Sequence, residues 1–148
     1  MKIRNTNEAY YYFKDIIKNR GGEVVAHIPS GYHRIIKVKF KDRYFYFYLI
    51  FQREWFHNFR NIYNVNSDAC TIDLDILEAI NKMGFIDRLV FINKDGDAYM
   101  VNPYQMYREA KMRGWIRKQR NGTVVVHYPV TKMLKLLTPK YKEITEYA

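Results

Sequence analysis

The acidic residues of this chain are concentrated in one stretch. Carboxylates are the side chains of this chain best suited to bind a metal ion. Residues 68–97 hold seven of the fifteen acidic residues and three cations, although the formal net charge of the chain is +10. A basic surface attracts polyanions by neutralising phosphates, whereas a carboxylate cluster beside a polyanion is repulsive unless a metal ion or a proton neutralises it. Basic flanks around an acidic middle suit a metal-dependent nucleic-acid enzyme, and an acidic surface patch without chemistry is the alternative.

Four acids in this stretch are the candidate catalytic residues: Asp73, Asp75, Glu78 and Asp87. Asp75 and Glu78 lie three residues apart, so they share one face of a predicted helix and are the candidate ligands for Mg²⁺. A bound Mg²⁺ could orient a water for attack on a phosphodiester. Local helix chemistry is the competing explanation, because Asp73 suits the positive end of the helix and Glu78 can pair with Lys82.

The most basic segment predicts a second function, contact with phosphates. Five cations crowd residues 111–120 (Lys111, Arg113, Arg117, Lys118 and Arg120), across a helix end and one arm of a predicted hairpin. A basic hairpin can follow a phosphate backbone. The alternative is an edge strand that uses Lys and Arg to prevent pairing with other chains.

A weaker basic patch surrounds the first predicted hairpin, at Lys37, Lys39, Lys41 and Arg43. The strand at residues 43–51 alternates: Tyr44, Tyr46, Tyr48 and Ile50 point to one face, and Phe45, Phe47, Leu49 and Phe51 point to the other. Apolar residues on both faces predict a central strand that is covered on each side. A row of tyrosines could instead be a platform for stacking bases.

The four histidines are scattered and have no metal-binding spacing. His27 and His127 lie near the ends of predicted strands, where a structural role is expected. His33 and His57 could act together only if the fold happens to bring them close.

These residues must be positioned by a mixture of helices and short strands. Asn5 and Glu8 predict a helix start, and Gly21-Gly22 predict its end. Strands are predicted at residues 23–28, 34–40 and 43–51, then a short helix or loop over 52–62 and a flexible connection over 63–69. A helix capped by Thr71 is predicted from about Ile72 to Met83.

The second half of the chain repeats this mixture. Strands are predicted from Arg88 and over residues 98–101, followed by a helix that begins at Asn102-Pro103 and ends at Gly114. Asn121-Gly122 predicts a hairpin with a two-residue turn between residues 115–120 and 123–128. A short helix over residues 131–137 and a charged tail over 138–148 complete the chain.

Antiparallel hairpins interrupted by helices predict an α+β fold, with an antiparallel or mixed sheet against three to four helices. A length of 148 residues suits one domain. No apolar run approaches the roughly 20 residues needed to span a bilayer. The single cysteine, Cys70, excludes an intrachain disulfide, and the start of the chain has no signal-peptide core, so an intracellular location is expected.

The N-terminal half resembles a degenerate member of the PD-(D/E)XK nuclease superfamily in the order of its elements over about residues 6–60. A first helix with an acid, Glu8, is followed by a strand and a hairpin of two more strands. The resemblance implies Mg²⁺-dependent cleavage of DNA. The family's acid on the middle strand and its E-x-K on the next have no counterpart at residues 34–40 and 44–51, so its metal site does not transfer to these positions.

The whole chain is also similar to small orphan nucleases and DNA-binding proteins of archaeal viruses, which are basic, tyrosine-rich and single-domain. Some of those proteins depend on an acidic residue outside the standard nuclease motifs. By that resemblance, Glu78 is the candidate for such a residue here.

Three functions follow as expectations. The first is a DNA-processing protein, a metal-dependent nuclease that uses the acids at 73–87. The second is a non-catalytic DNA-binding module, for which the basic hairpins suffice. The third is a structural or interaction protein that could form a homo-oligomer through its aromatic surface.

Overall fold

The computed structural model describes residues 2–31 and 33–136. Within this part of the chain, four α-helices, one 3₁₀ helix and nine strands follow one another. In chain order they are α1 (Thr6–Asn19), β1 (Glu23–Ser30), β2 (His33–Phe40), β3 (Arg43–Phe51), α2 (Phe59–Tyr63), β4 (Ala69–Asp73), α3 (Leu74–Met83), β5 (Arg88–Ile92), β6 (Ala98–Val101), α4 (Pro103–Arg113), β7 (Ile116–Lys118), β8 (Val124–Pro129), η1 (Val130–Lys132) and β9 (Leu134–Leu136).

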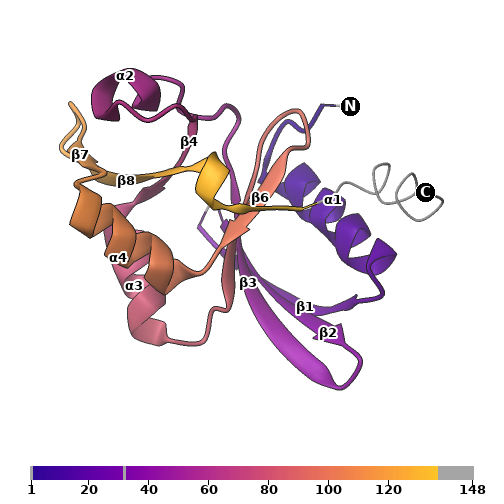
Figure 1. The fold of residues 1–148 in the computed structure, drawn as a ribbon. Coiled ribbons are helices and arrows are strands. Elements are labelled where there is room, and N and C mark those ends of the chain that lie inside the picture. Colours follow the sequence, from indigo (N-terminus) through magenta and orange to yellow (C-terminus); the bar gives the residue numbers. More distant parts are fainter. Residues whose placement is uncertain (1, 32, 137–148) are drawn as a thin grey trace.

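Two sheets organise these elements (Figure 1). The larger has six strands in the order β1-β2-β3-β5-β6-β9, and the smaller has three in the order β4-β8-β7. All neighbours are antiparallel except β3 and β5, which are parallel. The predicted α+β class with a mixed sheet is therefore confirmed.

Helix α1 covers one face of the large sheet. It begins at Asn5, whose side chain accepts a hydrogen bond from the backbone N–H of Glu8 at 2.8 Å, as the sequence predicts. Its buried residues recur at helical spacing and pack on a core that includes Ile36, Leu49 and Val90 of the sheet. We call this the α1 core.

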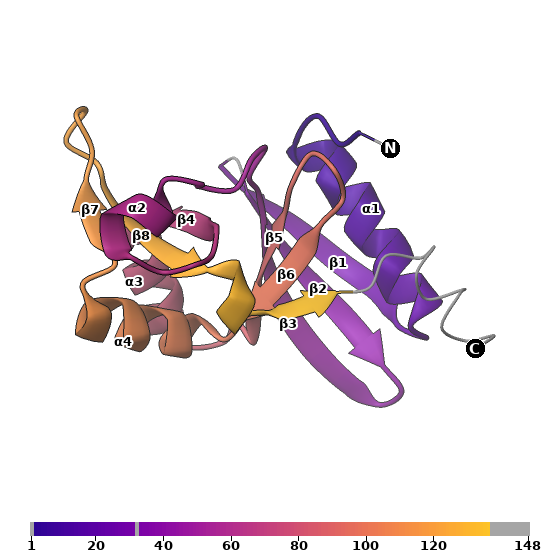
Figure 2. The ribbon, with the colours of Figure 1, turned by 45° about the horizontal axis from the view of Figure 1, so that its top comes forward.

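The other face of the large sheet packs against the small sheet and helices α2, α3 and α4 (Figure 2). The core between them contains Tyr48, Leu89 and Phe91 from the large sheet and both tryptophans of the chain, Trp55 and Trp115. We call this the inter-sheet core.

Strand β3 confirms the predicted alternation. Phe47 and Leu49 belong to the α1 core, whereas Tyr48 and Ile50 belong to the inter-sheet core. The strand is covered on both faces along its second half only, because Tyr44 is exposed.

Three local predictions are wrong. Helix α3 begins after Asp73, since residues 69–73 form β4 and pair with β8 where a Thr71 cap was expected. The helix predicted over 131–137 is absent from the described residues of that range, 131–136: Val130–Lys132 is a 3₁₀ turn, and Leu134–Leu136 pairs with β6. The hairpin loop at Asn121-Gly122 has three residues, 120–122, where two were predicted, because Gln119 N–H donates a hydrogen bond to Thr123 C=O. Gly122, at φ 87°, donates its N–H to Gln119 C=O within this loop.

The predicted tail at 138–148 lies outside the described residues. Within the described part, no helix is both long enough and apolar enough to cross a membrane.

Candidate nucleic-acid interface

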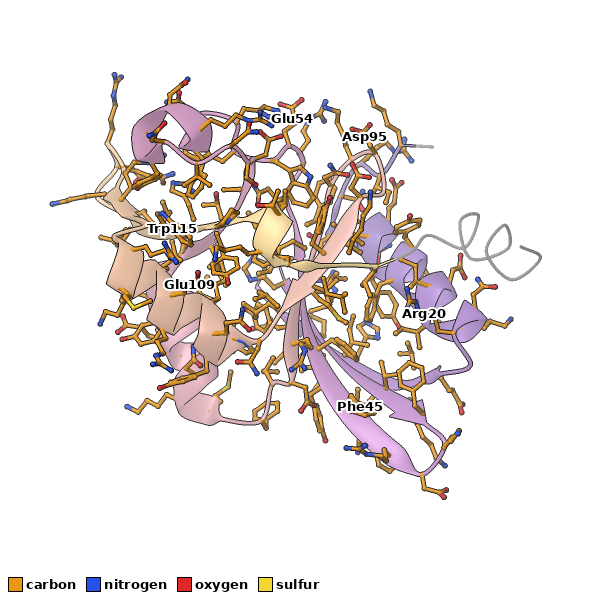
Figure 3. The ribbon with its side chains drawn as sticks, viewed as in Figure 1. Arg20, Phe45, Glu54, Asp95, Glu109 and Trp115 are labelled. Atoms are coloured by element: carbon orange, nitrogen blue, oxygen red, sulfur yellow. The ribbon has the colours of Figure 1, made fainter. Side chains whose placement is uncertain are left out.

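The β2–β3 hairpin extends away from the rest of the molecule, and Phe45 near its tip lies far from α4 (Figure 3). The second half of β2 alternates apolar residues with Lys37 and Lys39, and β3 is rich in aromatic residues, a composition that favours a half-buried sheet surface. Phe40 pairs with Arg43, so Lys41 and Asp42 form a two-residue loop. Lys41 has a left-handed φ of 53°, in keeping with a hairpin turn of this length.

One face of this hairpin combines cations with aromatic rings. Lys37 lies opposite Tyr46 in the strand register, and Lys39 lies opposite Tyr44. The Lys37 ammonium is 4.6 Å from the ring centre of Tyr44 and 5.6 Å from that of Tyr46, and the Lys39 ammonium is 5.8 Å from that of Tyr44. Phe85, just after α3, packs edge-on against Tyr46 with ring centres 5.3 Å apart. We call Lys37, Lys39, Tyr44, Tyr46 and Phe85 the aromatic–lysine face.

This face is partly open to solvent: its two outer rings are exposed, and Lys37, Lys39 and Tyr46 are half-buried. Tyr44 is 51% exposed and Phe85 is 44% exposed, whereas Tyr48, four residues beyond Tyr44 in the strand, is 4% exposed. Glu23 of β1 is in register with Lys39 but forms no ion pair with it, and neither lysine has an ion pair among the described residues. The lysines therefore remain available to a ligand.

Arg43, which the sequence groups with these lysines, points to the opposite face of the hairpin. Its guanidinium lies 5.3 Å from the ring centre of Phe45, a residue that packs against the α1 core. Strand alternation makes this separation inevitable, because Arg43 and Tyr44 are adjacent in β3.

Several cations in and beside the hairpin of β7 and β8 already contact other side chains of the protein. Arg117 stacks on Phe56, with 5.0 Å between guanidinium and ring centre, and its Nε donates to His127 Nε2 at 3.3 Å. Arg113 pairs with Glu109 at 3.2 Å, and Lys111 donates to the Tyr107 hydroxyl at 2.8 Å.

Among the described residues, Lys118 and Arg120 are the two of the five cations at residues 111–120 that are exposed and make no side-chain ion pair or hydrogen bond. Three of the five cations at residues 111–120 therefore have a partner within the fold. The β2–β3 hairpin, the weaker patch by sequence, presents its lysines beside exposed aromatic rings.

The predicted metal ligands lie on the outer surface of α3. Asp75 and Glu78 are both exposed. The Glu78 carboxylate accepts a hydrogen bond from the Tyr107 hydroxyl of α4 at 3.4 Å, and no ion pair joins it to Lys82 in the described structure. Both carboxylates are exposed to solvent and do not line the cavity that contains Asp73.

The other two acids have different surroundings. Asp87 Oδ2 accepts a hydrogen bond from the backbone N–H of Tyr46 at 2.7 Å, and Asp87 N–H donates to Tyr46 C=O at 2.8 Å, so Asp87 extends the pairing of β3 with β5. Asp73 lines a cavity between the sheets. The described residues contain no group of three His, Cys, Asp or Glu side chains that could hold a metal ion.

Three of the histidines have different surroundings: His127 is buried, His33 lines a cavity and His57 is paired with an acid. His127 is buried, stacks on Phe56 and shares a hydrogen bond with the Thr71 hydroxyl at 2.8 Å. Burial, aided by the Arg117 charge, lowers the pKa of His127 to about 4, so this side chain is neutral at pH 7. His33 lines the same cavity as Asp73, and His57 lies elsewhere, paired with Asp68 at 2.9 Å.

Comparison of the chain with known protein families, with curated proteins and with solved structures finds no match.

Proposed function

We propose that this protein binds single-stranded nucleic acid, with DNA as the expected partner, through the aromatic–lysine face. The observation that carries the proposal is the exposed Tyr44 ring between two lysines that have no acidic partner. Proteins that bind single strands combine a cationic surface for the backbone with aromatic rings on which bases stack. This function corresponds to the non-catalytic binding module among the three expectations.

The energies of the two interactions favour replacement of a lysine by a base on the Tyr44 ring when nucleic acid binds. An exposed cation–π contact contributes about 0.5–1 kcal/mol. Stacking of a base on an aromatic side chain contributes about 1–3 kcal/mol. A base can therefore displace Lys37 from the Tyr44 ring, and the displaced ammonium can pair with the neighbouring phosphate.

The geometry favours single strands over duplexes. In a duplex the bases are stacked on one another, so their faces do not reach an aromatic side chain on a protein surface. Tyr44 and Phe85 offer apolar surface that only an unpaired base can cover. A duplex would meet the lysines alone.

Tyr44→Ala tests this proposal. We expect the variant to lose about 5- to 150-fold in affinity for a labelled single-stranded oligonucleotide, measured by fluorescence anisotropy, because it removes a stacking ring. Its free energy of unfolding should fall by about 1–2 kcal/mol, since two exposed cation–π contacts are lost. Tyr104→Ala is the matched control, because Tyr104 is 61% exposed on α4 and lies outside the face.

Equal losses in the two variants, or unchanged binding in Tyr44→Ala, would contradict the proposal. Parallel titrations with RNA of the same sequence and with the duplex separate the alternatives. A parent protein that binds duplex more tightly than single strands would shift the function to phosphate contacts alone.

The nuclease interpretation remains a prediction of the sequence and has its own test. We expect linear and single-stranded DNA to remain intact after incubation with the parent protein and Mg²⁺, because the four predicted acids do not converge in the structure. Cleavage in Mg²⁺ that stops in EDTA, and that Glu78→Ala abolishes, would establish the nuclease and overturn this expectation.

A further inference from the structure

The cavity that contains His33 and Asp73 has the composition of a binding pocket. Its volume is about 300 Å³, within the range of small-ligand sites. Its apolar walls come from the ends of β3 and β4 and from the first turn of α3, and its polar lining comes from four side chains: His33, Gln52, Thr71 and Asp73.

Two of those four polar side chains are already occupied in the fold. Gln52 accepts a hydrogen bond from Thr71 N–H at 2.8 Å and donates to Glu54 C=O at 3.0 Å. The Thr71 hydroxyl is bonded to His127. These bonds fix the wall of the cavity and leave little capacity for a ligand.

His33 and Asp73 retain unused capacity. His33 Nδ1 is hydrogen-bonded to the Tyr48 hydroxyl at 2.9 Å, so Nε2 is the ring nitrogen left for a ligand. Burial lowers the pKa of His33, with the Asp73 charge opposing it, so the ring is neutral at pH 7. When Tyr48 donates to Nδ1, Nε2 carries the hydrogen and acts as a donor.

Asp73 supplies the complementary acceptor. It occupies the N-cap position of α3, yet its side chain makes no capping hydrogen bond. No ion pair involves Asp73 among the described residues. The cavity therefore combines a donor and an anionic acceptor with apolar walls.

We propose that this cavity binds one nucleobase, with Asp73 and His33 contacting its Watson–Crick edge and the apolar walls contacting its faces. All four bases carry an adjacent donor and acceptor on that edge, and proteins that read unpaired bases use such hydrogen bonds together with stacking. The inference rests on the proposed function, because it assigns the cavity to a base of the same single strand.

The placement of the two sites supports this assignment. His33 lies on the same face of β2 as Lys37 and Lys39, because alternate residues of a strand share a face. Lys39 lies six residue steps after His33, which corresponds to about 20 Å along the strand. A strand of about six nucleotides at stacked spacing would cover this distance, so one oligonucleotide could occupy both sites.

Titration with the free nucleosides adenosine, cytidine, guanosine and thymidine, followed by amide NMR shifts, tests the cavity by itself. These probes lack phosphate, so the lysines contribute little to their binding. We expect at least one nucleoside to shift the amides of residues 71–76 and Gln52. Asp73→Ala should weaken that binding about tenfold or more, because hydrogen bonds to a charged group are lost.

Three further variants complete the experiment. Ile76→Phe places a larger side chain in the cavity wall and should also weaken the binding, with both polar residues intact. Asp75→Ala removes one negative charge, as Asp73→Ala does, but Asp75 lies outside the cavity lining. Tyr104→Ala removes an exposed ring outside both sites, so both variants should bind nucleosides like the parent.

Nucleosides that leave residues 71–76 unshifted, or that bind Asp73→Ala and Asp75→Ala equally, would overturn the cavity proposal. Either result leaves the aromatic–lysine face untouched if Tyr44→Ala still loses oligonucleotide affinity. Conversely, intact nucleoside binding in the cavity with no effect of Tyr44→Ala on oligonucleotides would overturn the proposed interface alone.

Discussion

The double variant Lys37→Gln, Lys39→Gln is expected to bind single-stranded DNA more weakly and with a shallower dependence on salt. For single strands, log K falls against log salt concentration with a slope of about −0.7 per neutralised phosphate. Loss of two contacts should therefore reduce the slope by about 1.4. If parent and variant converge near 1 M salt, the affinity loss is about 60-fold at 50 mM and about 10-fold at 200 mM.

The matched control is Lys14→Gln, Lys18→Gln. These two lysines are exposed on α1, which covers the opposite face of the large sheet, and they change the net charge of +10 by the same amount. A general effect of net charge would reduce affinity in both double variants. A specific interface reduces the slope only in the Lys37 and Lys39 variant, and equal slopes in the two would refute it.

The alternation of apolar and polar residues predicts most of the large sheet correctly, because local sequence determines which side chains of a strand share a face. Phe47, Leu49, Tyr48 and Ile50 lie in the expected cores. Helix ends at Asn5, Asn102, Gly84 and Gly114 are also as predicted, since capping depends on residues within one turn.

The failures occur where distant pairing competes with local propensity. Met133 and Leu136 have helical spacing and are both buried, yet their segment extends the large sheet at β6. The start of α3 is delayed because β4 pairs with β8, more than fifty residues later in the chain. Local patterns contain no information about such partners.

In the candidate sites too, the sequence predicts features that depend on neighbouring residues and misses those that depend on distant parts of the chain. The tyrosine row is visible in the sequence as a choice between core and stacking platform, and the structure divides it: Tyr48 is buried and Tyr44 is exposed. The contribution of Phe85 could not be predicted, because it reaches Tyr46 from another part of the chain. His33 and Asp73 are forty residues apart, and the sequence selects Asp73 as a candidate catalytic acid rather than as a cavity residue.

Phe13→Ala is expected to cause the largest loss of stability. Phe13 is fully buried in the α1 core and packs edge-on against Phe47 with ring centres 5.3 Å apart. Truncation of a buried Phe costs about 3–5 kcal/mol, which for a chain of this size lowers Tm by about 6–20 °C. Phe85→Ala, the same change at an exposed position, should cost less than about 1 kcal/mol.

Phe13→Ala also tests the prediction of one domain, because the mutated residue and the two fluorescent tryptophans lie in different cores. Trp55 and Trp115 report on the inter-sheet core through their fluorescence, whereas Phe13 lies across the large sheet in the α1 core. Both cores share the strands of that sheet, so loss of one should destabilise the other. In a single cooperative domain, tryptophan fluorescence and far-UV circular dichroism give coincident transitions. Fluorescence that melts at the parent temperature in Phe13→Ala, while circular dichroism shifts, would show instead two separately folding units.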